Sequence, residues 1–352
     1  MIFVDGMRKR SLFLPAAWIF VSFFAVRSEA FAQIPKASVS VRMITTEAQV
    51  PSARSTAFPL STFQAVHSIP RKSGTARYFS ISGLLTDGSV GSLMESLFKY
   101  SGQVPFVQAL GINAFLFTAL RGKLLSALTP EGFFHAMALG TMLWTTLGWR
   151  GWSYCVLYLI LGQVVTKVGF ADKEKRGIAE ARGGRRGPEN IWGSAATSLI
   201  CAICSVQGDS FLGLSPKLYT LGFVAALATK LADTFASEIG KAYGKTTFLI
   251  TNLKRVEPGT EGAISAEGTA AAALGGFLLS SFGYSLGLID LPSVAVATVA
   301  AFLATNVESL IGATLQGKEG FGFMTNEVVN FVNTLIGGSI AIAAGILVIG
   351  MT

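Results

Sequence analysis

Histidine, cysteine and charged residues are all scarce in this chain of 352 residues. The two histidines, His67 and His135, are too few for a histidine metal centre. The three cysteines lie in apolar stretches, which excludes the cysteine framework of a small secreted domain. Charged residues make up 14% of the chain, whereas a soluble domain has about 25%. With 51% hydrophobic residues and a mean hydropathy of +0.54, the composition indicates an integral membrane protein.

Two further observations exclude some classes of function. The chain has no Asp-x-x-x-Asp and no Asn-Asp-x-x-Asp box, which argues against a prenyltransferase or a phosphatidyltransferase. The net charge of +8 arises mostly in residues 1–80, which hold ten Lys or Arg against three Asp or Glu. The basic charge therefore belongs to the leader, and we expect no nucleic-acid partner.

The leader has two parts with different compositions. Residues 1–30 resemble a signal peptide, with Met7-Arg8-Lys9-Arg10, an apolar run and then Ser28-Glu29-Ala30. Residues 31–80 resemble a disordered transit peptide, because residues 36–80 hold six Lys or Arg, one acid and 13 Ser or Thr. This order resembles presequences directed to secondary plastids of the red-algal lineage; a secreted or mitochondrial protein is the alternative. Residues 81–103 form a polar segment before the membrane domain.

The remaining chain, residues 104–352, predicts an all-α polytopic membrane bundle in the lipid bilayer. A bilayer span needs about 20 apolar residues. Eight segments approach this length, with seven spans as the alternative: 104–120, 131–148, 151–169, 191–206, 218–239, 263–289, 291–315 and 327–350.

Polar loops alternate with short connections along this domain. The polar loops are 121–130, 168–190, 240–262 and 316–326, and two spans separate each from the next. All four should therefore emerge on one face of the membrane. Loop 168–190 carries six Lys or Arg, so the positive-inside bias places that face in a stroma-like compartment.

The strongest motif is KLADTFASEIGKAYGKTT, residues 230–247. A helix would align Lys230, Asp233, Ser237 and Lys241 on one stripe. Ionisable groups at membrane depth usually face a cavity or a partner. We expect Asp233 and Glu238 to bind Mg²⁺, which prefers carboxylate oxygens and phosphates. An intramembrane ion pair is the alternative.

The end of this motif carries further phosphate-binding candidates. Lys241 and Lys245 are expected to stabilise a transferring phosphoryl group, with Gly244 and Thr246 contacting phosphate. The spacing is one residue short of a Walker A loop and follows a helix, so we reject that assignment.

Two other loops have suitable chemistry. In GRRGP, residues 184–188, Arg185 and Arg186 can bind phosphate between Gly184 and Gly187; the alternative is only the positive-inside signal. In residues 258–269 the candidates are Gly259, Glu261, Ser265 and Glu267, with helix capping as the alternative.

The last two spans carry polar residues as well. Glu308 lies inside the seventh apolar segment and is the third candidate metal ligand. Asn326 and Asn330 share a helical stripe with Asn333 and Gly337 and are candidate nucleotide ligands. Interhelical hydrogen bonding is the alternative for both groups.

The chain resembles the plant phytyl-phosphate kinases of the vitamin E pathway over about residues 104–350. The resemblance is carried by GRRGP, SEIGKAYGKTT (237–247), GTEGAISAEGT (259–269), ESLIGA (308–313) and NEVVNFVN (326–333). It implies a plastid-membrane kinase that converts phytyl phosphate to phytyl diphosphate with CTP or another nucleoside triphosphate. A membrane transporter for isoprenoid phosphates or small molecules is the alternative, and the sequence identifies no protein partner.

Overall fold

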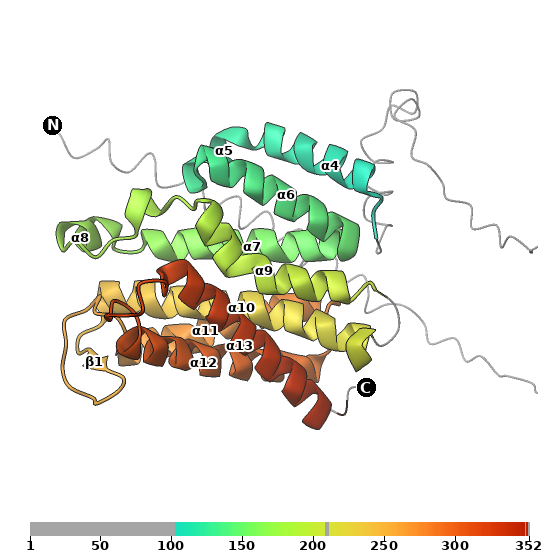
Figure 1. The fold of residues 1–352 in the computed structure, drawn as a ribbon. Helices are drawn as coiled ribbons and strands as arrows, with labels where there is room; N and C mark the ends of the chain where they lie inside the picture. Colours follow the sequence, from blue (N-terminus) through green and yellow to red (C-terminus); the bar gives the residue numbers. More distant parts are fainter. Residues whose placement is uncertain (1–102, 208–210, 349, 351–352) are drawn as a thin grey trace, which may run out of the picture. The chain divides into compact units, whose positions relative to one another are not determined.

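A computed structural model describes residues 103–207, 211–348 and 350. The predictions for the signal-like segment, the transit-like segment and the polar segment up to residue 102 lie outside the described residues. The described part is almost entirely helical, which confirms the all-α prediction (Figure 1).

Each of the eight predicted segments is a helix. They are α4 (Phe106–Ala119), α6 (Pro130–Thr146), α7 (Gly148–Lys167), α9 (Pro188–Cys204), α10 (Pro216–Tyr243), α11 (Ala266–Ser285), α12 (Leu291–Thr314) and α13 (Asn326–Leu347). Two short helices, α5 (Arg121–Ala127) and α8 (Phe170–Lys175), lie in the polar loops. The sequence did not reveal the two-residue strands β1 (Phe248–Leu249) and β2 (Ala263–Ile264), which pair antiparallel in the third loop.

The helices begin where the local sequence supplies a starting signal. The side chains of Thr129, Ser265, Asp290 and Thr325 each accept a hydrogen bond from a first-turn backbone N–H. Pro188 occupies the first turn of α9, where its missing N–H leaves no hydrogen bond unmade. These caps fix the ends of the helices at the face that carries the polar loops, except for Asp290.

Helix α10 is the central element of the bundle. It packs against α7, α9, α11, α12 and α13, and its residues 221 and 223–229 are fully buried. Small residues allow the close approach: a Cβ atom on Gly337 of α13 would lie 2.0 Å from the Thr229 hydroxyl oxygen. Polar groups on α10 are therefore held at fixed positions by neighbours on several sides.

All four polar loops meet at one end of the bundle, as predicted by counting spans. Figure 1 shows α5, α8 and β1 at the same side. Backbone bonds connect the first and second loops, with Thr129 N to Arg186 O at 3.0 Å and Arg186 N to Ala127 O at 2.9 Å. Gly259 of the third loop packs against Ile178 of the second.

By length and composition, α12 and α13 are the helices in the described residues that are long and apolar enough to cross a membrane. The other long helices either fall short of this length or are less apolar, and α10 carries five ionisable residues.

Candidate functional site

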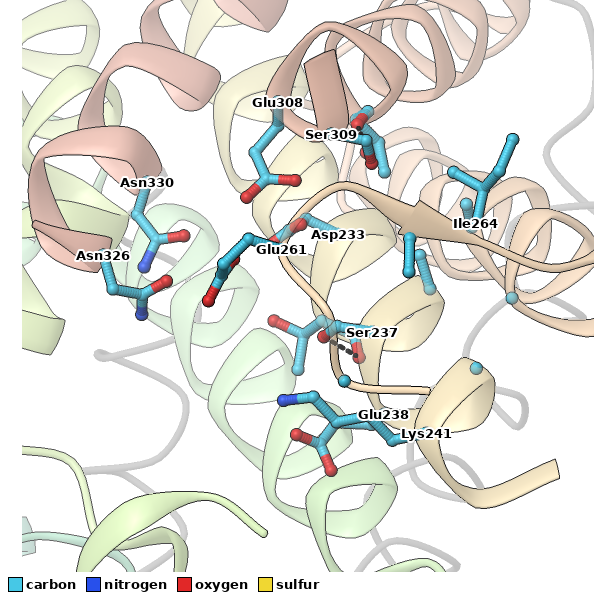
Figure 2. Close-up of a pocket in the computed structure, with 18 of the residues that line it drawn as sticks. Asp233, Ser237, Glu238, Lys241, Glu261, Ile264, Glu308, Ser309, Asn326 and Asn330 are labelled. Carbon is cyan, nitrogen blue, oxygen red and sulfur yellow. Dashed lines mark hydrogen bonds between the residues drawn. The ribbon is translucent and has the colours of Figure 1, made fainter. Parts of the chain in front are cut away.

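A cavity of about 190 Å³ opens at the end of the bundle where the polar loops meet (Figure 2). Helices α9, α10, α11, α12 and α13 line it together with the second and third loops and Thr166 at the end of α7. Twelve of the seventeen predicted site residues contribute to its wall. They are Gly184, Arg185, Arg186, Asp233, Glu238, Lys241, Gly259, Glu261, Ser265, Glu308, Asn326 and Asn330.

Three carboxylates come together on one side of this cavity. Asp233 on α10, Glu308 on α12 and Glu261 on the third loop interact electrostatically, and Figure 2 shows their side chains facing a common space. Gly262 permits this arrangement, because its φ of +75° and a virtual Cβ only 2.5 Å from Ser309 O exclude a side chain. Sequence reasoning placed Glu261 with the nucleotide rather than with the acids.

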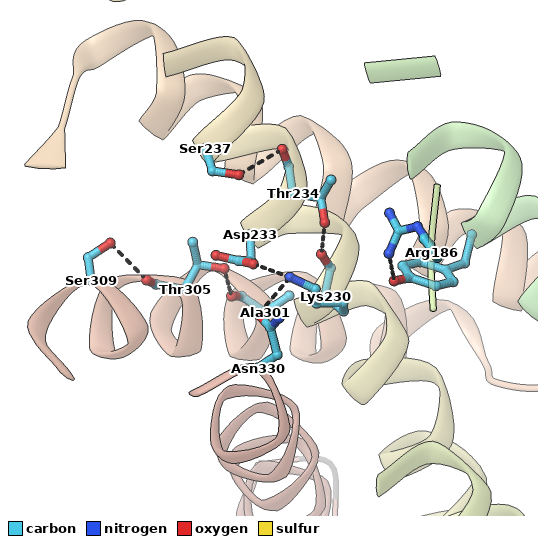
Figure 3. A network of polar contacts seen from close by, with 10 residues as sticks. Arg186, Lys230, Asp233, Thr234, Ser237, Ala301, Thr305, Ser309 and Asn330 are labelled. Atoms are coloured by element: carbon cyan, nitrogen blue, oxygen red, sulfur yellow. Dashed lines mark hydrogen bonds and ion pairs between the residues drawn. The ribbon is translucent and has the colours of Figure 1, made fainter. Parts of the chain in front are cut away.

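The buried side chain of Lys230 contacts Asp233, one of the three carboxylates (Figure 3). Its Nζ donates to Asp233 Oδ2 at 2.5 Å and to Asn330 Oδ1 at 2.8 Å. Lys230 is 7% exposed and Asn330 is 4% exposed, so both polar groups are shielded from bulk water. The ion pair that the sequence offered as the alternative to a metal site is present within α10, and the bond to Asn330 also connects α10 to α13.

The opposite wall carries positive charge. Arg186 Nη1 donates to the Tyr158 hydroxyl at 2.9 Å, and the guanidinium lies 5.5 Å from the centre of that ring. Gly162 of α7 leaves room for this side chain, since a Cβ there would lie 2.8 Å from Arg186 Nη2. Arg185 and Lys241 also line the cavity; Arg185 is exposed to solvent, whereas Lys241 is half-buried like Arg186.

Glu238 has a partner that the sequence did not reveal. Its Oε2 accepts a bond from Lys173 Nζ, and both side chains are almost completely buried. Lys173 was interpreted only as one of the basic residues of a loop. In the structure it belongs to α8 and points inward, while its neighbour Lys175 is 79% exposed.

Five predicted site residues do not line the cavity: Lys245, Gly187, Gly244, Thr246 and Glu267. Gly187 caps α9 and Gly244 caps α10, so both have a clear structural role. Lys245 is exposed, and its backbone N–H approaches Glu267 Oε1 at 3.4 Å. Ser265 lines the cavity and also caps α11, which confirms the capping interpretation.

Two buried polar atoms in residues that line the cavity have no hydrogen-bond partner within the described residues. They are Arg186 Nε and the Ser194 hydroxyl oxygen. Buried polar groups are normally hydrogen-bonded, so a ligand or water is expected to satisfy these atoms.

No group of three or more His, Cys, Asp or Glu in the described residues forms a complete metal site. Mg²⁺ usually takes one or two carboxylates as ligands and keeps several waters. The side of the cavity formed by Asp233, Glu261 and Glu308, called the carboxylate wall below, therefore still fits this ion.

Comparisons with known proteins agree with a membrane bundle. The chain is 47% identical over 251 residues to an uncharacterized membrane protein of Synechocystis, covering 71% of this chain and 95% of that protein. It is 40% identical over 268 residues to "Protein VTE6, chloroplastic" of Arabidopsis thaliana, covering 76% and 78%. An uncharacterized membrane protein of Methanocaldococcus jannaschii is 32% identical over 227 residues, covering 64% and 88%.

No solved structure matches the chain. The family model described as "Integral membrane protein DUF92" matches residues 113–338, which include all four polar loops and every residue of the carboxylate wall. The chain therefore belongs to the integral membrane protein family DUF92.

Proposed function

We propose that this protein is a plastid-membrane kinase that transfers a phosphoryl group from CTP or another nucleoside triphosphate to phytyl phosphate. The observation that carries the proposal is the cavity itself, whose lining combines the carboxylates of Asp233, Glu261 and Glu308 with the basic side chains of Arg185, Arg186 and Lys241. Phosphoryl transfer depends mostly on positioning and charge stabilisation, so it needs this mixture and no histidine base. The resemblance to phytyl-phosphate kinases and the similarity to a chloroplastic relative support the substrate class and the location.

The acceptor is already an anion in this reaction. One of its phosphate oxygens attacks the γ-phosphorus, the bond to the β-phosphate oxygen breaks, and the nucleoside diphosphate leaves with that electron pair. Arg185 and Arg186 can each offer several N–H donors to phosphate oxygens. Lys241 also lines the cavity and would add positive charge for the incoming nucleotide. Lys245 could reach the nucleotide only from outside the cavity wall.

The carboxylate wall is suited to a magnesium nucleotide. Asp233 and Glu308 would hold Mg²⁺, with Glu261 beside them and Glu238 contributing through the oxygen that Lys173 leaves open. When bound, the ion would neutralise charge on the phosphates. Gly184, Gly259 and Asn326 line the cavity. The two glycines would contact the nucleotide through backbone groups, and Asn326 through its side-chain amide.

The position of the cavity favours a kinase over the transporter alternative. Transporter sites commonly lie near the middle of the bilayer between broken helices. Here α10 runs without a break from Pro216 to Tyr243, and the cavity lies at the end of the bundle. At this position water-soluble nucleotide and a membrane-dissolved prenyl phosphate can reach the same group of residues.

The test is phosphate transfer from radiolabelled CTP to phytyl phosphate in membranes that contain the full chain. We expect phytyl diphosphate with wild type and at least about 100-fold less with Asp233→Asn. If folded wild type gives no product with CTP, ATP, GTP or UTP, the kinase assignment is wrong. If Asp233→Asn stays within about threefold of wild type, the metal assignment of Asp233 is wrong.

The cellular location is a separate proposal. A secondary plastid, reached through the two-part leader, follows from the composition of residues 1–80. Fusing residues 1–103 to a fluorescent protein in an alga with a secondary plastid tests it. Plastid fluorescence that is lost when residues 1–30 are removed is expected, and a mitochondrial signal would contradict it.

A further inference from the structure

The buried lysine of α10 has an unused donor. A lysine ammonium has three N–H groups and no acceptor. Two of them go to Asp233 and Asn330, and both acceptor residues also line the cavity. No third partner for Lys230 Nζ is found in the described residues, and Lys230 itself forms part of the cavity wall.

Lys230 also stands between the two charged walls. On one side it interacts electrostatically with Glu308 and is bonded to Asp233. On the other side its charge interacts with the Tyr158 hydroxyl group and is repelled by the like charge of Arg186, which donates to that hydroxyl. Figure 3 shows Asp233 and Arg186 on opposite sides of Lys230. A phosphoryl group that passes from a metal-bound nucleotide to an arginine-bound phosphate would cross this point.

We propose that Lys230 is a catalytic residue whose third Nζ donor binds a non-bridging oxygen of the phosphoryl group in transfer. This inference rests on the proposed function, which supplies the phosphoryl group. As the bond to the β-phosphate breaks and the bond to the acceptor oxygen forms, Lys230 keeps its three protons and stabilises the equatorial oxygens. Asp233 and Asn330 hold the ammonium in place, so little reorganisation is needed during the step.

A purely structural role would give Lys230 a different behaviour. In that case the polar contacts of Lys230 would only connect α10 to α13, and their loss would lower the stability of the protein without changing its affinity for phosphate. Another buried polar contact between two helices serves as a matched control. The Thr197 and Thr334 hydroxyls bond at 3.0 Å between α9 and α13, both residues are buried, and neither lines the cavity.

The first experiment measures the thermal unfolding of the purified full chain in detergent, with and without Mg²⁺ and inorganic pyrophosphate. We expect pyrophosphate to raise the midpoint of wild type and of Thr197→Val. For Lys230→Gln, which keeps a donor for Asp233, we expect about 10- to 100-fold weaker binding. Equal protection of wild type and Lys230→Gln would overturn the proposal, and so would an absence of protection in wild type.

A second measurement needs no variant and remains valid if Lys230→Gln fails to fold. Wild type is treated with pyridoxal phosphate, an aldehyde that carries a phosphate, then with borohydride, and the labelled lysines are identified by mass spectrometry. Labelling of Lys230 should fall at least about fivefold when Mg²⁺-pyrophosphate is present, while the exposed Lys245 is labelled equally in both samples. Unchanged labelling at Lys230, or none at all, counts against the proposal.

These readouts separate the inference from the kinase assignment. If pyrophosphate binds through Lys230 but no nucleotide supports transfer to phytyl phosphate, the proposed function fails and the phosphate contact stands. If transfer occurs and Lys230→Gln retains kcat within about threefold of wild type, the kinase assignment stands and the role of Lys230 is refuted.

Discussion

The Nζ atom of Lys173 and the Oε2 atom of Glu238 form an ion pair that is closed off from solvent, with side-chain exposures of 0% and 3%. Lys173 Nζ also donates to the Thr166 carbonyl at 3.0 Å, so the short helix α8 is anchored to the ends of both α7 and α10. This anchor fixes the start of the loop that carries Arg185 and Arg186 to the cavity.

The first prediction concerns this anchor. Lys173→Met leaves the Glu238 carboxylate buried without its partner, which should cost about 3–5 kcal/mol of unfolding free energy. Chemical unfolding of the purified protein in detergent measures the loss. The control is Lys175→Met on the same helix, where Lys175 and Asp172 are 79% and 82% exposed and their pair contributes little. Similar stability for both variants would show that the buried pair does not anchor α8.

The second prediction tests the close packing of α10 and α13. Gly337→Ala places a Cβ atom 2.0 Å from the Thr229 hydroxyl oxygen, and Thr229 is completely buried. Overpacking of this kind should destabilise the protein by about 1–3 kcal/mol. Gly111→Ala is the matched control, because a Cβ on Gly111 of α4 meets nothing within 4 Å.

The readout for Gly337→Ala is the midpoint of thermal unfolding. We expect a lower midpoint for this variant and an unchanged or slightly higher one for Gly111→Ala, since alanine favours a helix over glycine. If both variants unfold at the wild-type temperature, α10 and α13 are further apart than the structure indicates.

The third prediction concerns Glu308 in the carboxylate wall. Glu308→Gln keeps the size of the side chain but removes its charge beside Asp233 and Glu261. Kinase activity should fall at least about 100-fold, and higher Mg²⁺ concentrations should recover part of it, because the variant weakens metal binding. Glu319→Gln, in an exposed part of the fourth polar loop, should behave like wild type. Equal activity of both variants would show that Glu308 does not bind the metal.

The fold could be predicted in detail because it follows from long apolar runs. Each run became a helix within a few residues of the predicted bounds, and counting the runs placed the four polar loops at one end of the bundle. The stripe of Lys230, Asp233, Ser237 and Lys241 was also correct, since helix geometry alone aligns these positions. Local periodicity was sufficient for all these predictions.

The parts that could not be predicted depend on contacts between distant segments. Lys173 and Lys175 are two residues apart in one basic loop, and only the packing of α8 buries one and exposes the other. Glu261 joins the acids through the turn at Gly262 and the short β1–β2 pair, whose strands are too short to give a sequence signal. Glycine motifs also proved ambiguous: Gly187 and Gly244 were assigned to phosphate binding but cap helices.

The last prediction concerns the difference between arginine and lysine at position 186. The Arg186 guanidinium covers the Tyr158 ring, donates to its hydroxyl, and keeps an unpartnered Nε among the described residues. A lysine ammonium has no planar fork, so it cannot lie flat over the Tyr158 ring and bind two phosphate oxygens in the bidentate geometry of a guanidinium. Arg186→Lys should therefore lower kcat/KM for the prenyl phosphate about 10- to 100-fold.

The control for Arg186→Lys is Arg121→Lys, at an exposed position in α5, which should keep wild-type kinetics. Arg186 can bind phosphate, and it can also support α7 through its bond to Tyr158. Tyr158→Phe separates these two functions, because it removes the hydroxyl acceptor and keeps the ring. If Arg186 binds phosphate directly, Tyr158→Phe should reduce kcat/KM much less than Arg186→Lys does. If the two variants lose equal activity, Arg186 acts by supporting α7, and the phosphate must be bound by Arg185 and Lys241 instead.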